Sequence, residues 1–218
     1  MAARIPGARL AVLEGASAIP YVGDVGSVIA AIDEFLGAPE REASPEPVRS
    51  GLLTILFTDL VSSTALTRRL GDERAQDLVR RHNTVVREAL HAHGGDEIKH
   101  TGDGIMASFA TASGAIACAV AIQRTIAAEP AGDMAVHIGL NAGEPVVEDR
   151  DLFGTSVQMA RRICDHATAG QIVVANVVRE LAAGKGFLFA DLGDVVPKGF
   201  EDPVRLYEVR WQDERPAP

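Results

Sequence analysis

The chain has 218 residues and a mass of 23.0 kDa, enough for one full domain and a short additional segment. Hydrophobic residues make up 47% of it and charged residues 23%, which excludes intrinsic disorder of the whole chain. The formal net charge of -9 argues against non-specific binding to nucleic acid or to a membrane surface. A phosphate ligand remains compatible with this charge, since it needs only local positive groups or a metal.

Targeting and redox signals are few. The longest apolar run, 115–122, is far short of the roughly 18 residues of a membrane span, and the start MAARIPGARL lacks a signal-peptide core. The two cysteines, Cys118 and Cys164, suggest no disulfide framework and lie in apolar helical patterns, so we expect both to be buried and inert. These features predict a cytoplasmic protein with no membrane segment.

The first fifty residues differ from the rest. Residues 1–37 predict one strand and one helix, too little to bury a core alone. Residues 38–50 hold three prolines among charges, which is typical of a linker. We therefore expect the main domain at 51–211 and a tail at 212–218.

Strand and helix patterns alternate along the main domain and include a hairpin, which predicts an α+β fold rather than a fully parallel sheet. Thr111 or Ser113, and further along Asn176, are candidate helix caps. The expected elements, in chain order, are a strand at 52–57, a helix at 62–92, two strands in 97–109, a helix at 111–128, a strand at 134–142, a helix at 155–167, a strand at 172–175, a helix at 176–183, and strands at 187–196 and 204–209.

A carboxylate follows the first buried strand. Asp59 ends the run ILFTD, where an ionised side chain is costly unless it is paired or bound to a metal. The next residues, Ser62, Ser63 and Thr64, open a helix whose free N–H groups suit an anion. The alternative is that Asp59 simply caps this helix, because Asp is a favoured capping residue.

A second carboxylate, Asp103, lies in the tight turn Gly102-Asp103-Gly104, which is also the sequence of an ordinary hairpin turn. Two such carboxylates brought together would repel each other unless cations lay between them. Two divalent ions about 4 Å apart are a common arrangement for phosphoryl chemistry, and Mg²⁺ suits oxygen ligands and phosphates. Lys99 lies four residues before Asp103, and even spacing would place both on one face of a regular strand.

Three segments together resemble the class III nucleotidyl cyclases, the catalytic domains of adenylyl and guanylyl cyclases. They are FTDLVSST at 57–64, KHTGDGIMASF at 99–109 and DLFGTSVQMARR at 151–162, and the ending KGFEDPVRLYEV at 198–209 is similar to that of many bacterial members. The resemblance spans about 52–209. It implies a ferredoxin-like α+β core that works as a head-to-tail homodimer with shared active sites.

The resemblance also implies metal and phosphate ligands. Asp59 and Asp103 match the two aspartates that hold two Mg²⁺ or Mn²⁺ ions per site, and Leu60 offers a backbone carbonyl. The backbone from Leu60 through Val61 to Thr64, which includes Ser62 and Ser63, matches the triphosphate-binding segment.

Lys99 and Asp151 match the pair that reads the base, although an aspartate in the acidic stretch EDRDLFG would by default be a solvated loop residue. Lysine can donate to adenine N1 and aspartate can accept from the 6-amino group, whereas guanine presents the opposite pattern. Arg162 matches the arginine that stabilises charge on the phosphates, although an arginine pair with Arg161 is more often a solvated face.

One position departs from the family: Gln158 stands where an asparagine usually orients the ribose. A second phosphate-binding lysine has only a weak match in Lys198. The implied activity is conversion of ATP to cyclic AMP and pyrophosphate. The alternatives are a weak or inactive nucleotide-binding module, motivated by Gln158, and a guanylyl or relaxed-specificity cyclase.

Two further segments resemble protein families other than the class III nucleotidyl cyclases. Gly94-Gly95-Asp96-Glu97 is similar to the GGDEF signature of diguanylate cyclases, but a helical stretch precedes it, so we interpret Gly94-Gly95 as a helix stop. Residues 5–36 resemble the last strand and helix of an α/β-hydrolase, with Ala18 where the catalytic histidine would fall. We therefore predict a hydrolase remnant without hydrolase activity.

Overall fold

The computed structural model describes residues 51–61, 63–129 and 134–212. The hydrolase-like segment at 1–37, the linker at 38–50 and all but the first residue of the tail lie outside these ranges, so they stay predictions. Every strand expected within the described ranges forms, with bounds that shift by at most three residues.

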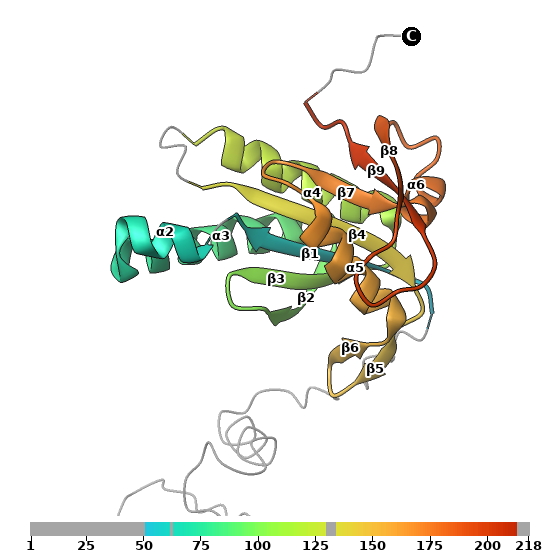
Figure 1. Ribbon diagram of the computed structural model, residues 1–218, viewed down its shortest axis with the longest axis horizontal. Helices are drawn as coiled ribbons and strands as arrows, with labels where there is room; N and C mark the ends of the chain where they lie inside the picture. Colours follow the sequence, from blue (N-terminus) through green and yellow to red (C-terminus); the bar gives the residue numbers. More distant parts are fainter. Residues whose placement is uncertain (1–50, 62, 130–133, 213–218) are drawn as a thin grey trace, which may run out of the picture. The chain divides into compact units, whose positions relative to one another are not determined.

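A mixed, largely antiparallel sheet forms the centre of the domain (Figure 1). Its strand order is β2-β3-β1-β4-β7-β9-β8, and only the β4–β7 pair is parallel. This arrangement confirms the expected α+β class. The strands are β1 (Leu53–Leu60), β2 (Gly95–His100), β3 (Gly104–Phe109), β4 (Val136–Gly143), β7 (Ile172–Ala175), β8 (Phe189–Val195) and β9 (Val204–Val209).

Helices cover both faces of β1, and its side chains alternate between them. Leu56 packs into the cluster formed with α3, α4 and α6, whereas Ile55 and Phe57 pack with residues of α5 on the other face. Asp59 has the same parity as Ile55 and Phe57, so its side chain lies on the α5 face. The helices are α2 (Ser63–Leu70), α3 (Asp72–His93), α4 (Ala112–Ala127), α5 (Thr155–His166) and α6 (Asn176–Leu181).

The single helix expected at 62–92 is wrong, because the structure has two helices there. Gly71 separates α2 from α3 with a φ of 82°, a backbone conformation that glycine adopts without a steric penalty. α3 ends at His93, and Gly94 takes the left-handed conformation with its N–H donating to the carbonyl of Leu90. The interpretation of Gly94 as a helix stop is therefore confirmed.

The two predicted caps have different outcomes. The Thr111 hydroxyl accepts a hydrogen bond of 3.2 Å from the N–H of Gly114, which confirms it as the cap of α4. Asn176 does not cap α6. It is the first residue of that helix, and its side chain instead binds Glu180 one turn later, at 2.7 Å.

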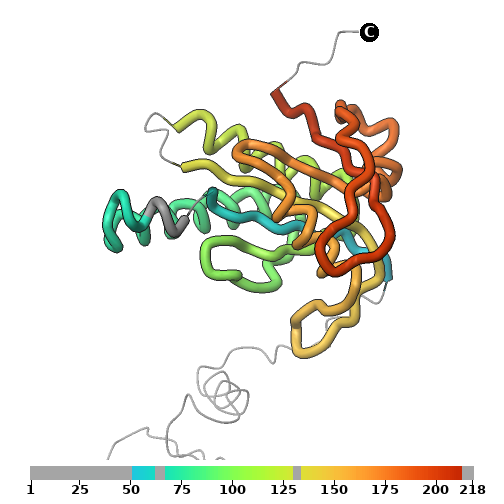
Figure 2. The backbone as a smooth tube through the Cα atoms, viewed as in Figure 1, coloured from blue at the N-terminus to red at the C-terminus, as the bar shows by residue number. Residues whose placement is uncertain are grey.

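A second, two-stranded sheet was not expected. β5 (Val146–Glu148) and β6 (Asp151–Phe153) pair through a turn in which Asp149 and Arg150 have φ values of 48° and 64°. A two-residue hairpin turn of type I′ has positive φ at both central residues, but Arg150 stands where glycine is usual, so no standard turn signal marks this hairpin. β6 contacts β2, and Figure 2 shows the β5–β6 hairpin as a separate loop beside the main sheet.

Both cysteines are free and fully buried, as expected. Burial raises the pKa of the Cys118 thiol to about 12 and also raises that of Cys164. Both thiols are therefore protonated at neutral pH, which confirms that they are structural rather than reactive.

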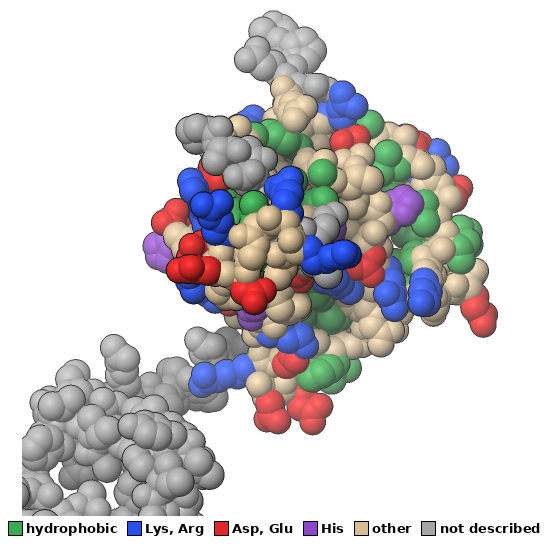
Figure 3. All heavy atoms as spheres, turned by 60° about the vertical axis from the view of Figure 1, so that its left-hand side comes forward, with side chains coloured by type: hydrophobic (Ala, Val, Ile, Leu, Met, Phe, Trp, Pro, Cys, Tyr) green, Lys and Arg blue, Asp and Glu red, His purple; other side chains and the backbone are tan. Residues whose placement is uncertain are grey.

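The surface gives no sign of a nucleic-acid site on the face shown in Figure 3. Basic and acidic side chains are interspersed there rather than gathered into one basic patch. None of the helices in the described ranges is long and apolar enough to cross a bilayer.

Candidate functional site

The strand register brings the two predicted metal aspartates together. Asp59 lies opposite Gly104 of β3 on one side and opposite His137 of β4 on the other. A Cβ atom on Gly104 would lie 2.0 Å from the carbonyl oxygen of Thr58, so only glycine lets the turn that carries Asp103 approach β1 this closely. Asp103 is near enough to lower the pKa of Asp59.

Asp59 is a mostly buried carboxylate, with 14% of its side chain exposed. Its Oδ2 atom accepts a hydrogen bond of 2.9 Å from Nη2 of Arg161 and lies 3.8 Å from Nε2 of His137. Burial alone would raise the pKa of this carboxyl group, but His137, Asp103 and the charge of Arg161 outweigh burial and lower it to about 2. Asp59 is therefore ionised at neutral pH.

The oxygen atoms of this site fit a hard divalent cation. Asp59 Oδ1 is buried without a hydrogen-bond partner, which is costly for a carboxylate unless another ligand satisfies it. The described residues contain no cluster of three or more His, Cys, Asp or Glu side chains that could hold a metal. An ion at Asp59 and Asp103 would therefore complete its coordination with backbone, water or phosphate oxygens, as Mg²⁺ commonly does.

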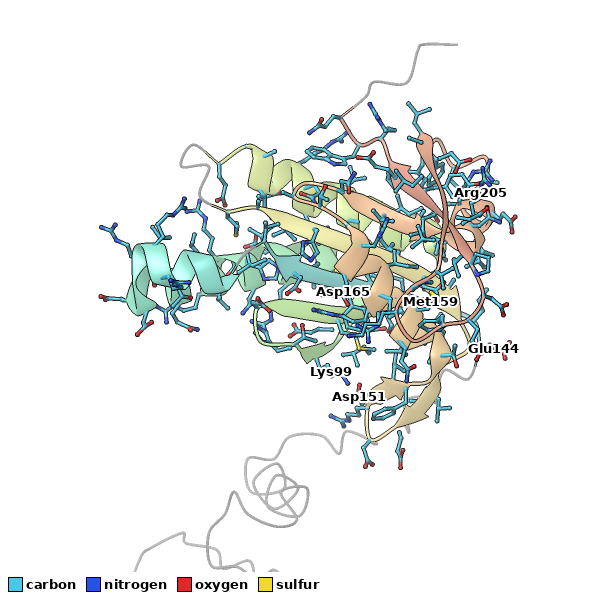
Figure 4. The ribbon with its side chains drawn as sticks, in the orientation of Figure 1. Lys99, Glu144, Asp151, Met159, Asp165 and Arg205 are labelled. Carbon is cyan, nitrogen blue, oxygen red and sulfur yellow. The ribbon has the colours of Figure 1, made fainter. Side chains whose placement is uncertain are left out.

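The predicted base-reading residues form an ion pair. Nζ of Lys99, on β2, lies 2.6 Å from Oδ2 of Asp151, the first residue of β6. The Asp151 Oδ1 atom accepts from the N–H of Leu152 at 2.7 Å, and Lys99 lies 5.4 Å from the ring centroid of Phe153. The hydrogen bond from Lys99 lowers the pKa of Asp151. Figure 4 shows the two side chains pointing toward each other from β2 and the β5–β6 hairpin.

Two details of this prediction were wrong. Asp151 is a strand residue with a partner rather than a solvated loop residue. Lys99 and Asp103 do not share a regular strand, because β2 ends at His100, its register shifts between Glu97 and Lys99, and Asp103 lies in the following turn. The spacing argument for a shared face therefore fails.

The segment predicted to bind the triphosphate is only partly available. Leu60 is buried in β1, and the N–H of Val61 donates to the carbonyl of Ala135 at 2.9 Å. Ser63 and Thr64 are the first two residues of α2, whereas Ser62 lies outside the described ranges. The first-turn N–H groups of α2 are the remaining donors of this segment. Asp59 lies within β1, four positions before the first residue of α2, so the alternative that Asp59 caps this helix is wrong.

The side chains of Arg161 and Arg162 on α5 take different directions. Arg162 pairs with Asp165 at 3.1 Å and lines a cavity of about 260 Å³ together with Lys198. Gln158, four residues before Arg162, is exposed. Arg162, predicted to bind phosphate, and the weakly matched Lys198 thus line one cavity, whose lining does not include Asp59.

Arg161 is the residue that sequence reasoning missed. It follows the buried positions Val157 and Ala160 and precedes Cys164, so the helical spacing places it on the stripe of α5 that faces the sheet. That spacing was a usable signal, because an arginine on a buried stripe next to a strand-end aspartate predicts an ion pair. The adjacent Arg162 obscured this spacing, because two consecutive arginines are typical of a solvent-exposed helix face.

Comparison with known proteins identifies the fold and the family. The pattern of the Adenylate and Guanylate cyclase catalytic domain family matches residues 46–210. The chain belongs to this family. The matched range contains all four residues of the two pairs, Asp59 with Asp103 and Lys99 with Asp151, and it also covers Gly94–Glu97.

Individual relatives agree with this cyclase assignment. A protein of Rhizobium meliloti described as putative adenylate cyclase 3 is 33% identical over 79% of the chain, which spans 30% of that protein. The adenylate/guanylate cyclase/hydrolase of Silicibacter pomeroyi is 30% identical, with a TM-score of 0.62 over 73% of this chain and 96% of that one. An adenylate cyclase of Trypanosoma brucei, 22% identical, shares the fold with a TM-score of 0.69 over 77% of this chain and 91% of that one.

Proposed function

We propose that this cyclase domain is an adenylate cyclase that converts ATP into 3′,5′-cyclic AMP and pyrophosphate. The observation that carries the proposal is the contact between Lys99 and Asp151. It presents one donor and one acceptor at one place, which complements the N1 and 6-amino edge of adenine. Guanine carries a donor and an acceptor in the opposite order, so this pair disfavours GTP.

The chain's own residues support a two-metal reaction centre. Asp59 is held ionised by its surroundings, Asp103 faces it across the turn, and the Leu60 carbonyl lies at the end of the same strand. Divalent ions bound there would favour ionisation of the ribose 3′-hydroxyl and offset the charge of the phosphates. The acidic pair supplies anionic ligands for this role, and the α2 N-terminus supplies N–H donors for phosphate oxygens.

Arg162 and Lys198 provide the remaining positive charge of the proposed site. Both line the same cavity of about 260 Å³, so a phosphate group there would meet a guanidinium and an ammonium. Arg162 would stabilise the charge that develops on the α-phosphate while the 3′-oxygen attacks and pyrophosphate leaves. Gln158, one turn before Arg162 on α5, would orient the ribose through its amide.

We further propose that the active form is a head-to-tail homodimer in which one chain supplies Asp59 and Asp103 and the other supplies Lys99, Asp151 and Arg162. Within one chain, Asp59 contacts Arg161, whereas Arg162 pairs with Asp165 and lines the separate cavity. A substrate that contacts both Asp59 and Arg162 would therefore bind between two chains, each of which supplies one of these residues.

The test is product formation by the purified full chain, with Mg²⁺ or Mn²⁺, beside an Asp59→Ala variant. The proposal predicts cyclic AMP from ATP in the unmutated protein, loss of product on removal of the metal with a chelator, and loss in the variant. A folded dimer that binds nucleotide but forms no product would favour the binding-module alternative, which the exposed Gln158 in place of asparagine motivates.

A further inference from the structure

Arg161 holds the proposed metal aspartate through a defined geometry. Its Nη2 atom lies 2.9 Å from Asp59 Oδ2, and its Nε atom lies 3.0 Å from Asp165 Oδ1, one turn along α5. The guanidinium also lies 5.9 Å from the ring centroid of Phe57. One side chain therefore bridges two carboxylates, and 35% of it is exposed to solvent.

The two oxygens of Asp59 have different surroundings. Oδ2 accepts a hydrogen bond from Arg161 and lies 3.8 Å from Nε2 of His137, while Oδ1 is buried with no partner. A divalent ion that binds Asp59 would meet a guanidinium on the same carboxylate, and two cations on one carboxylate repel each other. Arg161 can leave Asp59 without losing every partner, because Asp165 is already bound to its other edge.

We propose that Arg161 is an internal counter-cation of Asp59 that competes with the divalent ion, so that movement of Arg161 from Asp59 to Asp165 sets the metal affinity of the site. This inference rests on the proposed metal-binding role of Asp59. Without metal, Arg161 neutralises the mostly buried carboxylate. With metal, the ion takes over that task and Asp165 retains the guanidinium.

A purely structural ion pair would behave differently. If Arg161 only fixed α5 onto β1, its removal would loosen the Asp59 side chain and would leave metal affinity unchanged or weaker. Competition predicts the opposite sign, because removal of the competing cation frees both oxygens of Asp59. The sign of the change in metal affinity therefore separates the two roles.

The experiment measures Mn²⁺ binding to the full chain, without nucleotide, by the electron paramagnetic resonance signal of free Mn²⁺. For Arg161→Gln we expect binding about threefold to fivefold tighter than for the unmutated chain, the range typical of a partly exposed ion pair. Arg162→Gln is the matched control: it removes the same charge from the neighbouring position and from the same partner, Asp165, but it does not touch Asp59. Its Mn²⁺ affinity should stay within about twofold of the unmutated chain.

A substitution of Asp165 should change the Mn²⁺ affinity in the opposite direction. Asp165→Asn removes the alternative partner of Arg161, so Arg161 should stay on Asp59 and Mn²⁺ binding should weaken by about twofold to threefold. In the double variant Arg161→Gln with Asp165→Asn, the Asp165 substitution should have no further effect. A weakening that persists in the double variant would show that Asp165 acts through its own charge, and it would overturn the exchange between the two carboxylates.

Thermal unfolding provides a readout that does not depend on Mn²⁺ titration. Loss of Arg161 leaves Asp59 without its counter-cation only in the metal-free protein, so Mn²⁺ should raise the Tm of Arg161→Gln more than that of the unmutated chain. If Arg161→Gln does not fold, Arg161→Lys keeps the charge but lacks the fork that spans both carboxylates. Arg161→Lys should therefore also tighten Mn²⁺ binding, but by less than Arg161→Gln.

The outcomes separate this inference from the proposed function. Mn²⁺ binding that Asp59→Ala abolishes but that Arg161→Gln leaves unchanged or weakens would overturn the inference alone. Tighter binding in Arg161→Gln supports the inference even if the protein forms no cyclic nucleotide. Absence of Asp59-dependent Mn²⁺ binding in every variant would overturn both the inference and the metal-binding role on which it rests.

Discussion

Lys99 Nζ lies 2.6 Å from Asp151 Oδ2, which joins two residues 52 positions apart in the chain. The contact links β2 to a hairpin that lies outside the main sheet, with the side chain of Lys99 42% exposed and that of Asp151 26%. Donor and acceptor thus lie side by side and are accessible from solvent. An entering adenine would replace their mutual hydrogen bond with one bond to each residue.

This geometry predicts that base preference depends on the pair. The double variant Lys99→Glu with Asp151→Cys should lower the ratio of kcat/KM for ATP to that for GTP by at least about tenfold, because the new side chains no longer match the adenine edge. The measurement is initial rates with each nucleotide. Arg205→Ala is the control, since it breaks an exposed ion pair with Asp191 on other strands. An unchanged ratio in the double variant would remove Lys99 and Asp151 from base recognition.

Shared active sites predict complementation between inactive variants. Asp59→Ala and Lys99→Ala should each be inactive alone, whereas a mixture allowed to exchange subunits should recover about a quarter of the unmutated activity. Half of the randomly mixed dimers contain both variants, and each of these has one intact site of two. Mixing Asp59→Ala with Asp103→Ala is the control, because both lesions fall on the same side of the site and no intact site forms. Recovery in the control, or none in the test mixture, would contradict the shared-site arrangement.

The lowered pKa of Asp59 predicts a specific dependence of stability on acid. A carboxyl group whose pKa falls from 3.8 to about 2 on folding stabilises the protein fully above about pH 4 and loses that contribution as pH falls toward 2. The free energy of unfolding of the unmutated chain should therefore fall more steeply than that of Asp59→Asn over this window, by about 2 kcal/mol in total. Urea unfolding of both proteins at pH 5, 4, 3 and 2 measures the difference, and parallel curves would show that Asp59 titrates normally.

The close approach at Gly104 predicts a steric requirement. Gly104→Ala would place a Cβ atom against the carbonyl oxygen of Thr58 and force β3 away from β1, at a cost of about 3 kcal/mol in the free energy of unfolding. Gly199→Ala is the control, since that glycine has a positive φ of 90° but open space around it, and should cost about 1 kcal/mol. Chemical denaturation measures both. Similar costs for the two variants would show that β3 moves freely.

The sequence predicted the proximity of Asp59 and Asp103 well because it depends on local signals. A buried strand that ends in Asp59 and a hairpin turn that carries Asp103 become neighbours once β1 and β3 pair, and Gly102 and Gly104 mark the turn. The Lys99–Asp151 contact follows from no periodicity in the sequence. Only the family resemblance suggested it, because the β5–β6 hairpin that carries Asp151 is short and has Arg150 where glycine is usual.

Two other features that were not predicted from the sequence also have physical causes. The break at Gly71 lies inside a continuous apolar helical pattern, and the pattern does not reveal that the backbone there has a positive φ. Arg161 carries the same charge as its neighbour Arg162, so composition could not show that one side chain turns to the sheet and the other to a separate cavity. The helical spacing of Arg161 with the buried residues Val157, Ala160 and Cys164 does separate the two, because it places Arg161 on the stripe of α5 that packs against β1.

The proposed reaction of this domain is the conversion of ATP into cyclic AMP. The most direct measurement supplies equal concentrations of ATP and GTP to the full chain with Mn²⁺ and quantifies both cyclic products by mass spectrometry. The Lys99–Asp151 pair predicts an excess of cyclic AMP over cyclic GMP of at least about tenfold. Equal amounts of the two products, or an excess of cyclic GMP, would contradict the assignment of this domain as an adenylate cyclase.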